Sequence, residues 1–156
     1  MNIKFIIPGK RKNTFIEEGI QEYLKRLSKY CKANLFYVNE EKITTFNEKN
    51  IKEVHDKEAI NILKQIGDDY LVLIDVKGKE LTSDEFKVEF ENIISTQGNI
   101  SFVFGSSYGL SDILRNKADK KISLSKLTFT HYFSLLVLIE QVYRSFKIIN
   151  NETYDK

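Results

Sequence analysis

The sequence is poor in the residues that build cross-links, and it has no long apolar segment. Its 156 residues include one cysteine, Cys31, which excludes an internal disulfide and a cysteine-based zinc site. No catalytic signature flanks Cys31, so we interpret it as a structural or incidental thiol. The apolar runs fall well short of the roughly 20 residues that span a bilayer, and the β-rich start Met1–Pro8 is too short for a secretion signal. We therefore expect a cytoplasmic protein with no membrane partner.

The sequence also has little excess charge of either sign. There are 24 Lys and Arg against 22 Asp and Glu, a formal net charge of +2, so composition alone does not indicate a nucleic-acid partner. Positive charge gathers only locally, as in Lys10–Lys12, and such a cluster is more often a solvated surface than a binding site. Repeats, linkers and low-complexity tracts are lacking. We expect residues 1–156 to form one domain, which is long enough to bury a core.

What the sequence does contain is a regular alternation of strand-like and helix-like segments. Strands are expected at Ile3–Pro8, Asn34–Val38, Asp69–Val76, Asn99–Phe104 and Lys121–Leu124. Helices are expected from Thr14 to Leu27, Ile51 to Ile66, Thr82 to Ile94, Ser111 to Lys117 and Thr130 to Ile148. Nearly continuous apolar runs are typical of strands buried on both faces of a parallel sheet. We therefore predict an α/β fold, with a mostly parallel sheet and helices on both faces.

Two segments rich in small residues follow strands in the C-terminal third. Gly105–Gly109 follows the fourth strand and Ser123–His131 follows the fifth, and ligands of open α/β sheets bind outside the carboxyl ends of strands. The first segment matches neither a dinucleotide-binding loop nor a Walker loop. The second offers polar backbone groups and apolar contact, which suit an adenine ring or a thioether, but it also suits an ordinary N-cap. The residues alone leave a structural turn and a cofactor loop equally open.

The ionisable residues of this region form no familiar catalytic set. His131 begins the last helix, where a histidine more often caps or packs than catalyses, and His55 receives no role. No His, Asp or Glu set has metal-ligand spacing, so we expect no metal. Glu140 and Arg144 are four residues apart, as in an ordinary helical ion pair. The last helix has more apolar residues than one face can bury, which suggests that part of it lies in a subunit interface.

Taken together, these segments resemble the RlmH family of SPOUT methyltransferases. The matching segments are Phe102–Leu110 (FVFGSSYGL), Ser123–His131 (SLSKLTFTH), Leu135–Lys147 (LLVLIEQVYRSFK) and Glu22–Leu27 (EYLKRL). The resemblance covers the whole chain. It implies a SPOUT fold with a C-terminal trefoil knot, a homodimer, and S-adenosylmethionine as cofactor. The implied reaction is methylation of N3 of a pseudouridine in 23S rRNA on the assembled ribosome.

The resemblance also implies roles for individual residues. The implied cofactor pocket comprises Ile74, Gly105, Gly109, Leu124, Ser125, Lys126, Leu127, Thr128 and Phe129. The implied catalytic residues are His131, Arg144 and Tyr154, and the implied RNA-binding residues are Tyr143 and Lys156. The sulfonium methyl is already activated, so the enzyme's main task is to align the base nitrogen with it. A nearby base or cation could help the N3 proton to leave.

The sequence departs from the family pattern at a few positions. Thr130 and Ser106 stand where proline and glycine are usual, and Leu135 replaces an arginine. At the end of the chain, Thr153 and Asp155 replace a proline and a histidine. The changes at Leu135 and Asp155 remove positive or titratable groups from the RNA-facing side. An alternative function is therefore a ribosome-binding module that binds the cofactor with weak or no activity; a generic nucleotide-binding domain is disfavoured by the missing phosphate signatures.

Overall fold

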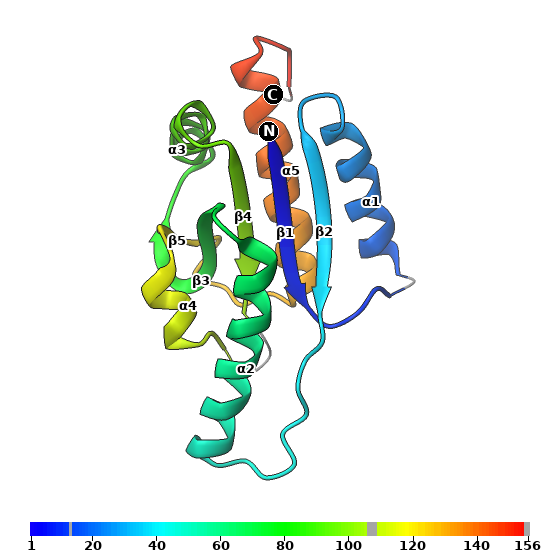
Figure 1. Ribbon diagram of the computed structural model, residues 1–156. Coiled ribbons are helices and arrows are strands. Elements are labelled where there is room, and N and C mark those ends of the chain that lie inside the picture. Colours follow the sequence, from blue (N-terminus) through cyan, green and yellow to red (C-terminus); the bar gives the residue numbers. More distant parts are fainter. Residues whose placement is uncertain (13, 106–108, 155–156) are drawn as a thin grey trace.

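The computed structural model describes residues 1–12, 14–105 and 109–154, in which one parallel sheet carries helices on both faces (Figure 1). The strands are β1 (Asn2–Pro8), β2 (Lys32–Val38), β3 (Tyr70–Glu80), β4 (Asn99–Phe104) and β5 (Lys120–Ser123). The helices are α1 (Phe15–Leu27), α2 (Glu48–Ile66), α3 (Ser83–Thr96), α4 (Asp112–Lys117) and α5 (His131–Ile149). The sheet order is β2-β1-β4-β3-β5 and all of its pairings are parallel. The predicted α/β class is confirmed.

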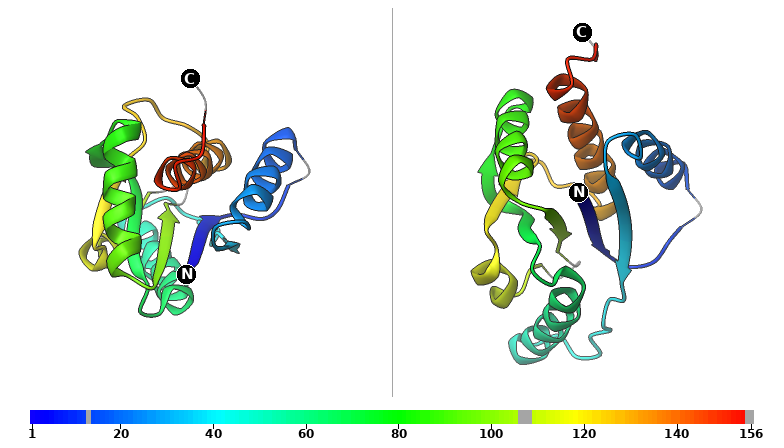
Figure 2. Two further views of the ribbon diagram at one scale, coloured as in Figure 1. Left: turned by 90° about the horizontal axis from the view of Figure 1, so that it is seen from above. Right: turned by 45° about the horizontal axis from the view of Figure 1, so that its top comes forward.

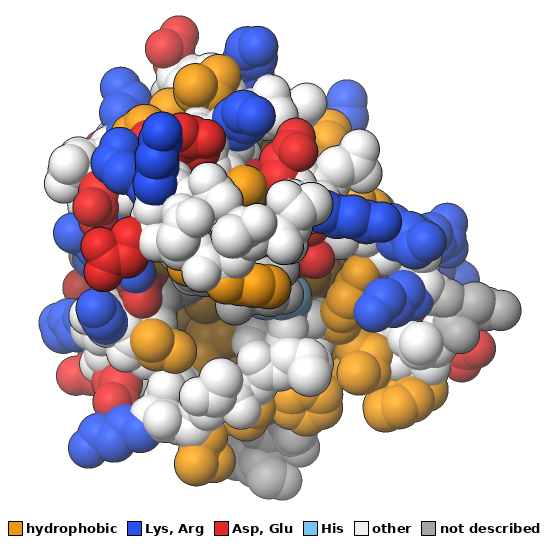
Figure 3. Space-filling view, turned by 90° about the horizontal axis from the view of Figure 1, so that it is seen from below, with side chains coloured by type: hydrophobic (Ala, Val, Ile, Leu, Met, Phe, Trp, Pro, Cys, Tyr) orange, Lys and Arg blue, Asp and Glu red, His pale blue; other side chains and the backbone are white. Residues whose placement is uncertain are grey.

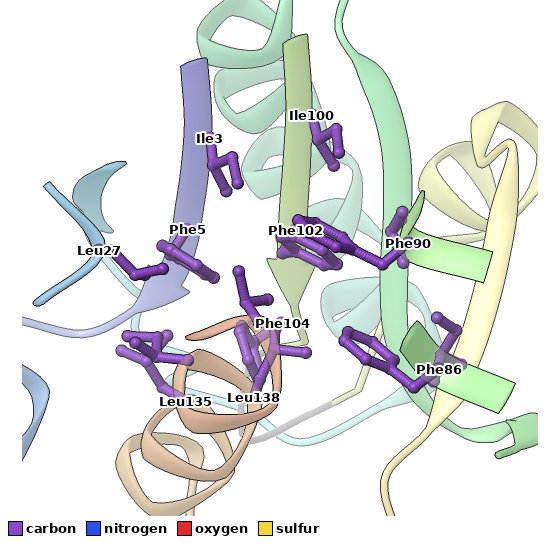
Figure 4. Packing of buried hydrophobic residues seen from close by; sticks show 14 of the residues in the cluster. Ile3, Phe5, Leu27, Phe86, Phe90, Ile100, Phe102, Phe104, Leu135 and Leu138 are labelled. Atoms are coloured by element: carbon purple, nitrogen blue, oxygen red, sulfur yellow. The ribbon is translucent and has the colours of Figure 1, made fainter. Parts of the chain in front are cut away.

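The two faces of the sheet have separate cores, because neighbouring residues of a strand point to opposite sides. Phe5 and Phe102 pack with residues of α1, α3 and α5, and their rings stack 5.5 Å apart (Figure 4). Ile6 and Val103, which directly follow Phe5 and Phe102 in the sequence, pack with α2 and α4 on the other face. Each fully buried side chain of this size contributes roughly 1.5–3 kcal/mol. Burial on both sides explains the continuous apolar runs.

Helix boundaries agree with local capping signals. The Thr14 hydroxyl accepts the Glu17 N–H at the start of α1, and Thr82 forms a capping box at the start of α3. The second helix begins at Glu48 rather than at the predicted Ile51. It starts earlier because the side chain of Asn47 accepts a backbone N–H of the first turn.

The end of β3 differs from the prediction, which placed a turn after Val76. Ile74 and Lys79 both pair with Ile122 of β5, so the residues between them bulge out of the ladder. At Gly78 an added Cβ would lie 2.5 Å from the backbone carbonyl carbon of Ile122, and only glycine allows this approach. The bulge therefore keeps β3 paired with β5 and positions the segment that follows β5.

The last helix, α5, runs between α1 and α3 along one face of the sheet (Figure 2). It starts at the carboxyl edge of the strands and ends at the opposite edge, where both termini lie (Figure 1). Nineteen residues at about 1.5 Å each give a length of roughly 28 Å. Among the described residues, no helix is both long and apolar enough to cross a membrane.

The position of α5 explains its high apolar content. Three of its sides face the sheet, α1 and α3, and its residues Leu138, Ile139 and Val142 are fully buried there. Most of the apolar excess of α5 is thus buried within the chain itself. Phe133 and Ile148 are the α5 residues that keep large exposed apolar surfaces.

Candidate active site

A cavity of about 330 Å³ opens at the carboxyl edge, between the β3 bulge, the end of β4 and the start of α5. Figure 3 shows this face hollowed, with hydrophobic side chains around the hollow. Its lining includes Ile74, Gly105, Gly109, Leu124, Ser125, Leu127, Thr128, Phe129 and His131. Among the implied cofactor residues only Lys126 is missing from the lining. The fold thus brings together residues that are far apart in the sequence, in a space of the size typical of small-molecule sites.

Gly105 and Gly109 each occupy a position that disfavours a larger residue. An added Cβ at Gly105 would lie 2.9 Å from Cγ of Leu110 and 3.1 Å from the carbonyl oxygen of Gly109. Gly109 itself has a φ of +102°, a value that other residues rarely adopt. Ser106 and the next two residues lie outside the described residues. Gly105 and Gly109, which both line the cavity, therefore stand where a larger residue would not fit.

The second loop is shaped by its own hydroxyl groups. Ser123 donates to the carbonyl oxygen of Ser125 at 3.0 Å, and the Ser125 hydroxyl accepts the N–H of Leu127 at 3.0 Å. Thr130 is the N-cap residue of α5, but its side chain makes no capping hydrogen bond. The segment therefore does not serve as a side-chain N-cap of α5. Leu127, which lines the cavity, is 69% exposed.

Sequence reasoning missed an ion pair in the cavity wall. Asp75 in the β3 bulge is 7% exposed. Its Oδ2 accepts from Nε of Arg115 at 3.0 Å, and its Oδ1 accepts the N–H of Lys77 at 3.1 Å. A buried carboxylate needs such partners, and this one ties α4 to β3. The available signal was an acidic residue at the end of the apolar run LVLI.

His131 lies at the mouth of the cavity with its side chain 30% exposed. Its Nε2 is 4.0 Å from Oε1 of Glu40. Burial lowers the pKa of His131 below its ordinary value; the Glu40 carboxylate opposes this change, and the charge of Lys12 adds to it. The imidazole is therefore neutral at pH 7 and able to accept a proton.

The other implied catalytic residues lie at the opposite end of α5. The Tyr154 hydroxyl donates to Oε1 of Glu140 at 2.8 Å, and Nη2 of Arg144 donates to the same oxygen at 3.0 Å. The ring of Tyr143 meets that of Tyr154 edge-on, with centres 5.3 Å apart. Burial, together with the bond to Glu140, raises the pKa of Tyr154. We name these four residues the tyrosine cluster; its phenol is a hydrogen-bond donor and not a base.

Within one chain the structure does not bring this cluster to the cavity. His131 and Arg144 are on one helix, thirteen residues apart, which corresponds to roughly 20 Å. Lys156, the other implied RNA-binding residue, lies outside the described residues, as does Asp155. The residues of the implied site therefore form two separate groups.

The C-terminal tail, which composition alone would describe as frayed, is fastened in its described part. Glu152 accepts from Nζ of Lys147 at 2.7 Å, from Nζ of Lys29 at 2.9 Å and from the Tyr30 hydroxyl at 3.0 Å. The bonds from Lys147 and Lys29 lower the pKa of Glu152 to about 2. Composition does not reveal these contacts, because Lys29 and Tyr30 are more than a hundred residues away in the sequence. These bonds of Glu152 fix the position of the tail that carries Tyr154.

The interpretation of Leu135 as an RNA-facing position is also wrong. Leu135 is 0% exposed and points into the core between α5 and the sheet (Figure 4). Its difference from the family arginine therefore removes no charge from the surface of this protein. Within the described part of the chain, no group of three or more His, Cys, Asp or Glu residues could hold a metal ion.

Comparisons with known proteins give a family, full-length relatives and a fold. The family model described as predicted SPOUT methyltransferase matches residues 1–155. The chain is 44% identical to proteins named ribosomal RNA large subunit methyltransferase H from Clostridium botulinum strains Langeland and Okra, and the alignments cover 100% of both chains. A solved probable methylase family protein from Haemophilus influenzae Rd KW20 matches with a TM-score of 0.56 at 11% identity, over 99% of this chain and 70% of that one. The last likeness concerns the fold alone.

Proposed function

Because the chain belongs to the SPOUT methyltransferase family, we propose that it transfers a methyl group from S-adenosylmethionine to N3 of a pseudouridine in 23S rRNA. The convergence of the two loops and His131 on one cavity carries the proposal. The full-length relatives named as methyltransferases of large-subunit rRNA support the substrate class. We further propose that the whole chain is one domain, that it acts in the cytoplasm on the assembled ribosome, and that its C-terminal segment is knotted.

The residues of the cavity fit the proposed cofactor. Ile74, Leu124 and Phe129 offer apolar walls for an adenine ring and a thioether carbon chain. Gly105 and Gly109 have no side chains, so their backbone allows a ligand to approach closely. When bound, S-adenosylmethionine supplies an activated methyl group. The protein then has to hold the base nitrogen in line with that group and exclude water.

His131 is the described residue best placed to take the N3 proton. Methylation joins N3 to the methyl carbon as the sulfur–carbon bond breaks, and the N3 proton leaves to a base. The neutral imidazole of His131 can accept it, and Glu40 at 4.0 Å stabilises the resulting cation. Tyr154 keeps its proton because its pKa is raised, and it can donate that proton to a base oxygen only when it releases its bond to Glu140.

The roughly 20 Å between the two groups supports a homodimer with shared sites. The Tyr154 hydroxyl bonds to Glu140, which is nine residues or roughly 13 Å along α5 from His131, and Tyr154 is not among the residues that line the cavity. We propose that the tyrosine cluster of one subunit faces the cavity of the other. The exposed side chains of Leu127 and Phe133, near the cavity, are available for such an interface.

Methyl transfer to ribosomes that lack the modification tests the function. Labelled S-adenosylmethionine is expected to give incorporation into 23S rRNA at one pseudouridine, located by mass spectrometry of digested RNA. Calorimetry with the cofactor alone is the companion measurement. Cofactor binding without any incorporation would contradict the proposal and favour the ribosome-binding module. Leu135 no longer favours that alternative, because it is buried.

A further inference from the structure

A basic loop lies beside the mouth of the cavity. Gly9–Lys12 connects β1 with α1, and its three cationic side chains are exposed. Figure 3 shows Lys and Arg side chains gathered beside the hollow on the side of α1. Arg11 pairs with Glu17 at 3.3 Å, whereas Lys10 and Lys12 form no ion pair with any described carboxylate. Two cations are therefore available to a ligand of the cavity face.

Tyr132 holds this loop against the start of α5. Its hydroxyl donates to the carbonyl oxygen of Lys10 at 2.6 Å, and the ammonium of Lys12 is 5.0 Å from the centre of its ring. Gly9 has a φ of +101°, and an added Cβ there would lie 2.8 Å from the Tyr132 hydroxyl. His131, the residue before Tyr132, lines the cavity. The contacts with Tyr132 therefore hold the basic loop next to the mouth of the cavity.

A groove of about 730 Å³ continues from the loop along α1. It is lined by Arg11, Lys12, Glu17, Glu18, Gln21, Glu22 and Lys25. Two of its glutamates are engaged within the protein: Glu17 accepts from Tyr37 at 2.7 Å, and Glu22 accepts from Arg26 at 2.8 Å. Its lining holds as many carboxylates as cations, so the positive charge of this region is concentrated in the loop itself.

We propose that Lys10 and Lys12 bind rRNA phosphates next to the target nucleotide, and that Tyr132 is the residue that positions them. The inference rests on the proposed function. A nucleotide whose base enters the cavity leaves its phosphates at the mouth, next to the start of α5, where Tyr132 holds the loop that carries both lysines. Ammonium groups bind phosphates strongly as point charges, and each such contact releases counterions.

Removing the two charges tests the phosphate contacts. The double variant Lys10→Ala/Lys12→Ala is compared with Lys57→Ala/Lys64→Ala, which removes two exposed charges from α2 on the other face of the sheet. Ribosome affinity is measured by filter binding at several salt concentrations. The loop variant is expected to bind about tenfold more weakly, and its dependence of log affinity on log salt is expected to be shallower by about 1.5. The α2 variant should match the unmodified protein.

Replacing Tyr132 by phenylalanine tests the positioning role, since it keeps the ring and every charge but removes the bond to Lys10. We expect the KM for ribosomes to rise about threefold to tenfold, while kcat and cofactor affinity stay unchanged. A fall in kcat with KM unchanged would overturn the role given to Tyr132.

Two results would overturn the phosphate assignment. One is a loop variant that behaves like the α2 variant. The other is a loss of affinity with an unchanged salt slope, which would assign the loop to a protein contact. Failure of the proposed function is distinguishable, because it shows as no incorporation by the unmodified protein, whereas ribosome binding is measured without turnover.

Discussion

The two ends of α5 differ in how far their polar groups are satisfied. At its start, His131 is neutral, has Glu40 only at 4.0 Å, and faces a cavity. At its far end, Glu140, Arg144 and Tyr154 bond to one another. The first arrangement leaves a proton acceptor facing a cavity, whereas in the second the donors are already bonded to Glu140. Under the proposed function, the proton acceptor and the tyrosine cluster therefore lie at opposite ends of one helix.

The supports of the two ends differ in the same way. The cavity depends on backbone contact, because Gly78 lets the β3 bulge approach β5. The tyrosine cluster depends on side-chain ion pairs, because Glu152 fastens the tail to Lys29 and Lys147. Backbone contacts fail steeply when one methyl group is added, whereas exposed ion pairs weaken gradually. Substitutions at the two ends should therefore have effects of different size and kind.

The largest effect is expected from Gly78→Ala. The new methyl group would overlap the backbone of Ile122, so the variant should lose about 3 kcal/mol in free energy of unfolding. Urea denaturation measures this loss, and calorimetry should show that cofactor binding is lost with it. Gly98→Ala is the matched control, since an added Cβ there meets no atom within 4 Å. Equal stability of the two variants would refute the role given to the bulge.

A smaller and purely functional effect is expected from Glu152→Gln. The amide cannot form the ion pairs with Lys147 and Lys29, so the tail that carries Tyr154 should lose its fixed position. We expect kcat to fall about tenfold with cofactor affinity unchanged, as measured by methyl transfer and calorimetry. Glu91→Gln is the control, because it breaks the exposed pair with Lys87 on α3. A change in cofactor affinity would show that the two ends are not independent.

The smallest effect concerns pH. Because burial lowers the pKa of His131, the imidazole is neutral at pH 7, and activity should fall only as the pH drops through that lowered pKa. The native state resists protonation more than the unfolded chain does, so stability is also lost in this acidic range. Glu40→Gln should move the acid limb of kcat/KM to lower pH, and Lys12→Ala should move it to higher pH. Shifts in the same direction would contradict the proposed surroundings of His131.

Sequence patterns could predict the fold and the cavity end because both follow from local rules. Apolar runs mark the strands, and parallel strands bring Ile74, Gly105 and Leu124 to one edge. The β3 bulge could not be predicted, since it depends on pairing with β5. The same holds for the partners of Glu152, which come from the distant end of α1. Local periodicity carries no information about such contacts.

The family resemblance led to a wrong interpretation of one position, Leu135. Leu135 looked like a lost surface charge, yet in this chain it packs in the core below α5. The resemblance also joined His131, Arg144 and Tyr154 in one set, whereas one chain separates them by most of a helix. Position along a helix, at 1.5 Å per residue, was the physical argument that could have separated them.

Complementation between two inactive variants tests the shared site most directly. Gly105→Ala damages the cavity and Tyr154→Phe removes the donor of the tyrosine cluster; each variant alone should show little methyl transfer to ribosomes. When the two are co-expressed, half of the dimers are mixed and one of the two sites in each is intact, so about a quarter of full activity should return. If the mixture stays as inactive as its components, each chain works alone and the account of two separated ends is contradicted.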